Sequence, residues 1–147
     1  MNEDVFHLGV KAVIQNNKGE IMLLKVNLKE LKGYKGEAYW DIPGGRVKLG
    51  DSIEDTLRRE VEEETGIKEI SILEKIDMVL SNNVRIPNSN GGTFGLILSI
   101  YKCVAKKAYV NISDEHVGCE WFKPGKAAKL LETKYPKEFT NKIALLN

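Results

Sequence analysis

Three glutamates between residues 60 and 64 have the side-chain type and spacing that best suit catalysis. Glu60, Glu63 and Glu64 stand at positions i, i+3 and i+4, so a helix would carry them on neighbouring positions about one turn apart. The segment 45–67 contains seven acidic and four basic side chains. A hard divalent cation relieves such repulsion, because Mg2+ takes carboxylates, waters and substrate phosphates as ligands. The spacing indicates a Mg2+ site, with Mn2+ as a second candidate metal; a solvated acidic helix face is the alternative.

The segment just before the acidic run can bring backbone close to it. Pro43, Gly44 and Gly45 follow one another, and glycine permits tight turns and the close approach of a ligand. We therefore expect Gly44 and Gly45 to bind substrate beside the glutamates. A simple strand-to-loop turn is the alternative reading.

The glutamates are expected to lie on a helix over residues 53–65. Ser52 is followed three residues later by Asp55, close to a capping box, and Gly66 suits a left-handed C-terminal cap. An apolar stripe at i, i+4 and i+8, expected to face a sheet, is formed by Ile53, Leu57 and Val61.

The whole stretch GRVKLGDSIEDTLRREVEEETGI, residues 45–67, resembles the signature of the Nudix hydrolase (MutT-like) family. That signature is G-x5-E-x7-R-E-U-x-E-E-x-G-U, with U a bulky aliphatic residue. Eight of its nine fixed positions are matched, by Gly45, Arg59, Glu60, Val61, Glu63, Glu64, Gly66 and Ile67. Asp51 stands where the signature has Glu, which shortens the side chain by a methylene and leaves open whether this position forms an ion pair.

The resemblance implies a fold, a cofactor and a reaction. The fold is an α/β/α sandwich with a mixed central sheet, over a single domain spanning residues 1–147. The reaction is Mg2+-dependent hydrolysis of a pyrophosphate bond in a nucleoside diphosphate linked to another group. Glu60 and Glu64 are implied to bind the metal and Glu63 to assist, while Arg59 orients a glutamate. The general base is implied to be either Glu60 or Glu115.

Substrate recognition outside the signature is only weakly indicated. An aromatic face can stack on a nucleobase, although core packing is the commoner use; the candidates are Trp40 above all, with Tyr34, Tyr39 and Phe94. Basic residues on loops can contact phosphate or stay solvated; these are Arg46, Lys48 and Arg85. His7 and His116 show no ligand spacing with each other and are set aside as metal or acid–base groups.

The remaining chain predicts a mixture of strands and helices. A hairpin is indicated over 8–14 and 21–26, with turn residues between, and a polar loop over 27–38 leads to a short strand at 39–42. Longer strands are expected at 70–80 and 93–104 with an irregular loop over 81–92. A last strand at 116–122 precedes a helix from Pro124 to about residue 131, and the tail from Pro136 is weakly specified.

Composition restricts the classes of partner. The 22 Lys and Arg nearly balance the 21 Asp and Glu, so no overall positive field attracts nucleic acid or an anionic membrane. Cys103 and Cys119 fit neither a CxxC pair nor a zinc pattern, and no apolar run approaches the roughly 20 residues of a membrane span. We expect a cytoplasmic protein with a small nucleotide substrate; a homodimer is compatible with the sequence.

Two other functions remain open at this point. The first is a non-catalytic nucleotide-sensing module that keeps the Nudix fold, although the signature glutamates are intact. The second is an RNA 5'-end pyrophosphohydrolase, which would favour a basic surface that the near-neutral charge does not suggest.

Overall fold

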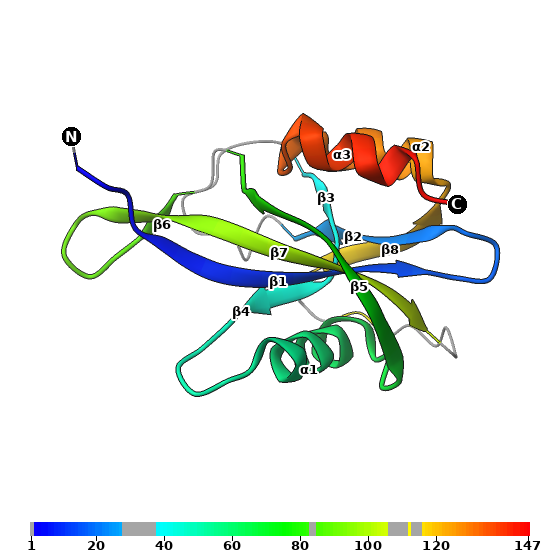
Figure 1. Ribbon diagram of the computed structural model, residues 1–147, viewed down its shortest axis with the longest axis horizontal. Coiled ribbons are helices and arrows are strands. Elements are labelled where there is room, and N and C mark those ends of the chain that lie inside the picture. Colours follow the sequence, from blue (N-terminus) through cyan, green and yellow to red (C-terminus); the bar gives the residue numbers. More distant parts are fainter. Residues whose placement is uncertain (1, 28–37, 83–84, 106–111, 113–115) are drawn as a thin grey trace.

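The protein is a three-layer sandwich. The computed structural model describes residues 2–27, 38–82, 85–105, 112 and 116–147. A mixed sheet lies in the middle, with helix α1 (Ile53–Thr65) on one face and helices α2 (Pro124–Leu130) and α3 (Lys137–Ala144) on the other (Figure 1). The predicted α/β/α sandwich is therefore confirmed.

Strand β1 (Phe6–Gln15) lies at the centre of the sheet. It runs parallel to β7 (Thr93–Ala105) on one side and antiparallel to β2 (Ile21–Val26) on the other, which makes the sheet mixed. Beyond β7 lies β5 (Ile70–Leu80), antiparallel to it. The remaining strands are short and pair with β1, β2 or β7: β3 (Trp40–Asp41), β4 (Gly44–Arg46), β6 (Ile86–Pro87) and β8 (His116–Phe122).

The predicted hairpin between β1 and β2 is confirmed, and its turn is formed by side-chain chemistry. The Asn16 side-chain oxygen accepts the backbone N–H groups of Lys18 (3.0 Å) and Glu20 (2.9 Å). Gly19 adopts a φ of 77°, the left-handed region that glycine enters without steric cost. The turn places β2 beside the central strand β1, and β3 then pairs with β2.

Helix α1 begins and ends as predicted. The Ser52 hydroxyl accepts the backbone N–H of Asp55 (3.1 Å), and Gly66 caps the other end with a φ of 77°, donating to the Glu62 carbonyl (2.8 Å). Leu57 and Val61 are fully buried against the sheet. The helix is thereby fixed so that Glu60 and Glu64 face the Pro43–Gly44–Gly45 segment, which we call the glycine corner.

One member of the predicted apolar stripe was wrong. Ile53, the first residue of α1, is 38% exposed and does not share the burial of Leu57 and Val61. Buried polar residues complete the inner face instead: Thr56, Glu64 and Thr65.

The two faces of the sheet have separate apolar cores. On the α1 side, Val10, Ala12 and Ile14 of β1 pack in one cluster with α1 residues. On the opposite side, Val13 lies in a second cluster with Tyr135 and other residues of the C-terminal helical layer. Because side chains alternate along a strand, β1 contributes to both cores, and its one buried charged residue, Lys11, lies on the side of the second cluster.

The C-terminal half confirms some expectations and corrects one. Pro124 occupies the first turn of α2, and the tail beyond Pro136 forms α3. The irregular loop predicted over 81–92 contains the short strand β6, which pairs with the start of β7; the Asn88 side chain accepts the N–H groups of Asn90 and Gly92 and so closes a hairpin turn. None of the described helices has the length and apolar composition to cross a membrane.

Candidate functional site

Glu64 is a buried carboxylate held by the glycine corner. Its side chain is 7% exposed, and the backbone N–H of Gly44 donates to Glu64 Oε1 at 2.8 Å. Strand β4 holds that amide in place, since Gly44 is in register with Lys11 and Pro43 O accepts the N–H of Ala12 at 2.8 Å. Glu64 therefore has a defined orientation, which a ligand for a metal ion requires.

Glu60 lies against the next residue of the corner. A Cβ atom added to Gly45 would come within 2.4 Å of Glu60 Cδ and 2.7 Å of Glu60 Oε1. The absent side chain of Gly45 therefore makes room for the Glu60 carboxylate. The corner contacts Glu64 through the amide of Gly44 and Glu60 through the bare Cα of Gly45, so two of the three predicted glutamates meet at one place.

Glu63 stands on the exposed side of α1. Among the described residues, no group of three or more His, Cys, Asp or Glu side chains is close enough to form a metal cluster. Mg2+ commonly binds proteins through one or two carboxylates and fills its shell with waters and substrate phosphates. The carboxylates of Glu60 and Glu64 at the corner fit that requirement by their chemistry.

The shortened side chain at position 51 still forms an ion pair. Arg59 Nη2 lies 3.1 Å from Asp51 Oδ2, and both side chains are partly exposed. Asp51 precedes the helix, so the contact ties the segment leading from the corner to the second turn of α1. A pair at this exposure contributes roughly 0.2–1 kcal/mol. Whether Arg59 also orients a glutamate during turnover stays a prediction.

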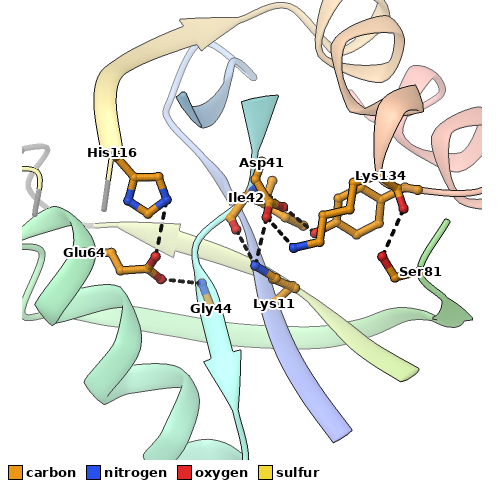
Figure 2. Close-up of polar contacts among 9 residues, drawn as sticks. Lys11, Asp41, Ile42, Gly44, Glu64, Ser81, His116 and Lys134 are labelled. Atoms are coloured by element: carbon orange, nitrogen blue, oxygen red, sulfur yellow. Dashed lines mark hydrogen bonds and ion pairs between the residues drawn. The ribbon is translucent and has the colours of Figure 1, made fainter. Parts of the chain in front are cut away.

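His116, set aside on sequence spacing, lies beside Glu64 (Figure 2). Its Nε2 is 3.5 Å from Glu64 Oε2, and its side chain is 7% exposed. Within the described part of the chain its Nδ1 has no hydrogen-bond partner. Burial, reinforced by the Lys11 ammonium, lowers the pKa of His116 to about 4, so a neutral imidazole stands next to Glu64 at pH 7.

A buried charged group, which we call the Asp41 cluster, lies on the other side of the glycine corner (Figure 2). Asp41 Oδ2 accepts from Lys134 Nζ (2.6 Å) and Lys11 Nζ (3.2 Å), and Asp41 Oδ1 accepts from the Tyr135 hydroxyl (2.6 Å). Lys11 also donates to the Ile42 carbonyl at 3.2 Å. Three segments of the chain therefore meet on one carboxylate.

The Asp41 cluster shifts the ionisation of its members. Burial alone would raise the pKa of the Asp41 carboxyl, but the two ammonium groups hold it well below its usual range. Burial and the neighbouring Lys11 lower the pKa of Lys134, against the pull of Asp41. Burial also opposes the charge on Lys11, yet Asp41 and Glu64 together raise its pKa. The influence of Glu64 on Lys11 shows that the cluster and the carboxylate at the corner are close enough to interact.

The other predicted substrate contacts are placed as follows. Arg46 is exposed at the end of β4. Trp40 is half-buried and packs edge-on against Phe122, with ring centroids 5.1 Å apart. Phe94 is buried and stacks on His7, with ring centroids 3.7 Å apart. Arg85 forms an ion pair with Asp4. Glu115 and Tyr34 lie outside the described residues.

Comparison with known proteins decides the family. A family model described as NUDIX domain matches residues 5–143, which includes the corner, α1 and the strands around them. The chain belongs to the Nudix family. Nucleoside triphosphatase NudI of Escherichia fergusonii is 38% identical to this Nudix chain over 89 residues, which make up 58% of the chain and 62% of NudI. The chain therefore matches less than two thirds of the length of this relative.

Solved structures agree with the family and the fold. The crystal structure of a MutT protein from Methanosarcina mazei Go1 matches this Nudix chain with a TM-score of 0.66 and 26% identity, over 97% of this chain and 94% of that one. A C. elegans Ap4A hydrolase matches with a TM-score of 0.64 over 94% of this chain and 95% of that one, and at 20% identity it shares the fold alone.

Sequence reasoning missed the Asp41 cluster, although a signal was present. Lys11 interrupts the apolar run of β1 at a position with the same parity as Val13, and a lysine facing a core needs a buried partner. Asp41 stands directly before the Ile–Pro–Gly–Gly segment. The partners Lys134 and Tyr135 are about 90 residues further along this Nudix chain, and spacing alone cannot pair them.

Proposed function

We propose that the protein hydrolyses a pyrophosphate bond in a nucleoside diphosphate linked to another group, with Mg2+ as its cofactor and Mn2+ as an alternative. The observation that carries the proposal is the pairing of the buried Glu64, bound by the Gly44 amide, with Glu60 in the space left by Gly45. Oxygen donors of this kind suit a hard divalent cation next to substrate phosphates. We also infer that residues 1–147 act as one domain.

Each site residue has a proposed role in the hydrolysis. Water attacks one phosphorus while the other phosphate leaves in line, and charge develops on the phosphate oxygens. The divalent metal, when bound, neutralises that charge and makes water easier to deprotonate. Glu60 and Glu64 would hold it, with Glu63 assisting from the exposed side of α1. Glu60 or Glu115 would take the proton from the attacking water.

The substrate is proposed to be a small nucleotide. The first-matched relatives carry the name nucleoside triphosphatase, which makes nucleoside triphosphates the first class to test. Gly44 and Gly45 would approach the phosphates through their backbone, while Arg46 and Trp40 remain candidate contacts for phosphate and base. Nucleotide sugars, oxidised nucleotides and dinucleoside polyphosphates stay in the panel as members of the same bond class.

The test is a turnover assay on the purified chain. The protein is incubated with Mg2+, with Mn2+ or with EDTA, and with nucleoside triphosphates, ADP-ribose, a dinucleoside polyphosphate and 5'-triphosphorylated RNA; products are separated by ion-pair chromatography. We expect metal-dependent release of a nucleoside monophosphate from small nucleotides. Reaction in 18O-labelled water identifies the phosphorus that is attacked.

Two outcomes would contradict the proposal. Binding of nucleotides without turnover in either metal would favour the nucleotide-sensing alternative. Turnover of the RNA at a much higher kcat/KM than of any small nucleotide would favour the RNA-end alternative.

A comparison of Glu60→Gln with Glu115→Gln identifies the general base. The pH–rate profile of each variant is measured, because loss of the base removes the acidic limb of the profile.

A further inference from the structure

The Asp41 cluster balances its two buried ammonium groups unequally. It contains the ammonium groups of Lys11 and Lys134 and the single carboxylate of Asp41. The side chains of these three residues are 10%, 12% and 6% exposed. Glu64 at the corner also acts on Lys11, whereas Lys134 shares the Asp41 carboxylate with Lys11. An incompletely compensated buried charge costs folding free energy, so Lys134 is the ammonium whose burial the fold explains least.

The two lysines differ in how many of their ammonium protons are donated in hydrogen bonds. Lys11 donates to Asp41 and to the Ile42 carbonyl. Lys134 donates to Asp41, and no second acceptor for its ammonium occurs among the described residues. An ammonium has three donor protons. Toward the described residues, Lys134 therefore keeps two unused donor protons and Lys11 keeps one, so Lys134 has the greater capacity to donate to a ligand.

The Lys134 side chain is not what fastens its segment to the sheet. The Lys134 carbonyl accepts the backbone N–H of Asn82 (2.7 Å) and the Ser81 hydroxyl (3.2 Å). The Asn82 side chain donates to the carbonyls of Glu132 and Tyr135, and the Tyr135 hydroxyl reaches Asp41. These contacts hold residues 132–135 without the ammonium group.

The cluster adjoins the candidate metal site (Figure 2). A Cβ on Gly44 would lie 2.7 Å from Lys11 Cδ, so the Lys11 stem runs over the same residue whose amide binds Glu64. The cluster therefore adjoins the place where the glycine corner holds Glu64.

We propose that Lys134 is a substrate-binding residue that donates a charged hydrogen bond to an oxygen of the bound nucleotide, with Lys11 and Asp41 holding its ammonium in position. The acceptor is a phosphate oxygen or a carbonyl oxygen of the base, since both have the same accepting chemistry. The inference rests on the proposed function for its ligand class, and its test is made without metal so that it does not depend on catalysis.

The test compares Lys134→Met with wild type. Lys137→Met is measured in the same way as the matched control. Methionine keeps an unbranched side chain and removes the charge, while Lys137 is a nearby lysine whose side chain is 71% exposed. Dissociation constants are measured by calorimetry in EDTA for the ribo- and deoxynucleoside triphosphates and for inorganic tripolyphosphate. Thermal unfolding of the free proteins is measured alongside.

We expect Lys134→Met to unfold within a few degrees of wild type and to bind about tenfold or more weakly, the order of one charged hydrogen bond. Lys137→Met should match wild type in both. Weaker binding of tripolyphosphate as well as of nucleotides assigns the acceptor to phosphate; weaker binding of nucleotides alone assigns it to the base.

Three results would overturn the inference. Unchanged dissociation constants in Lys134→Met would remove the lysine from the binding site. Absence of measurable binding to wild type would leave the Lys134 ammonium without a ligand. A large loss of stability in both Lys134→Met and Lys134→Gln would assign the ammonium to the fold. If wild type binds nucleotides but turns none over, the proposed function fails while a weakened Lys134→Met still supports this inference.

Discussion

At the scale of single residues, Glu64 combines two properties that the sequence does not show together. It is one of three glutamates in a charged run, yet it is buried and accepts the Gly44 amide. Glu63, one position earlier, is exposed. The same residue type within one turn of α1 therefore has a positioned member and a solvated member.

Glu64→Gln should leave the fold intact and strongly reduce metal-dependent turnover. The amide oxygen of glutamine can still accept from Gly44, but a neutral amide is a poor ligand for a hard cation. The loss in kcat should exceed the ~10–100-fold that removal of an outer-shell partner costs. Steady-state kinetics with increasing Mg2+ measures it, with the exposed Glu62→Gln as control. Full activity in Glu64→Gln would remove this residue from the metal site.

The two cysteines should react slowly in the folded protein. Burial raises the pKa of the Cys103 thiol to about 12 and that of Cys119 to about 11. Since the thiolate is the reactive form, both thiols should resist a thiol reagent at pH 8 and react on addition of denaturant. Rapid modification of either one in the native protein would contradict the packing described for it.

At the scale of elements, the glycine corner decides which groups meet. β4 is three residues long, too short for hydrophobic alternation to reveal it, and the sequence predicted only a turn or a ligand contact there. Its pairing with β1 sets the amide of Gly44 and the bare Cα of Gly45 against α1. The candidate metal site is thus assembled by a strand that pattern reading could not find.

Gly45→Ala should impair activity more than stability. The new Cβ would lie 2.4 Å from Glu60 Cδ, and the end of that flexible side chain can move aside at small cost to the fold. A displacement of about 1 Å in a catalytic group can cost on the order of 100-fold in rate. Thermal unfolding and kcat/KM are measured on the same preparation.

The matched control for Gly45→Ala is Gly125→Ala. Gly125 lies in α2 and a Cβ there meets nothing within 4 Å, so this variant should keep full activity and gain up to about 1 kcal/mol of stability. If Gly45→Ala is as active as Gly125→Ala, the contact between the corner and Glu60 has no part in the reaction.

At the scale of the whole molecule, Asp41 joins two strands of the sheet to the C-terminal helical layer. It connects β3 to Lys11 of the central strand and to Lys134 and Tyr135 between the C-terminal helices. The apolar side chains of Tyr135 and Phe139 pack in the same region. These buried hydrogen bonds favour one position of the C-terminal layer on the sheet, because a shift of the layer would leave buried polar groups without partners.

Asp41→Asn should be strongly destabilising, by about 3–5 kcal/mol, because two buried ammonium groups lose their only counter-charge in the cluster. The pKa of Asp41 is depressed from 3.8, so its contribution is complete above that pH and is lost as the pH falls below about 4. Urea denaturation should therefore give a constant difference from wild type between pH 5 and 8 that shrinks at lower pH. A difference below about 1 kcal/mol at pH 7 would show that the cluster is not a structural hub.

The sequence by itself determined the features that depend on neighbours along the chain. The caps of α1 at Ser52 and Gly66, the hairpin turn at Asn16 and Gly19, and the carboxylate spacing of the signature are local, because each is formed by groups a few residues apart. The signature also predicted the sandwich, by resemblance.

Only the tertiary structure decided which distant groups share a site. Glu64 receives the Gly44 amide, His116 approaches Glu64, and Lys134 reaches Asp41 93 residues away. The physical reason is that a buried polar group must find a partner wherever the fold places one, and strand register and layer packing, not spacing along the chain, decide where that is.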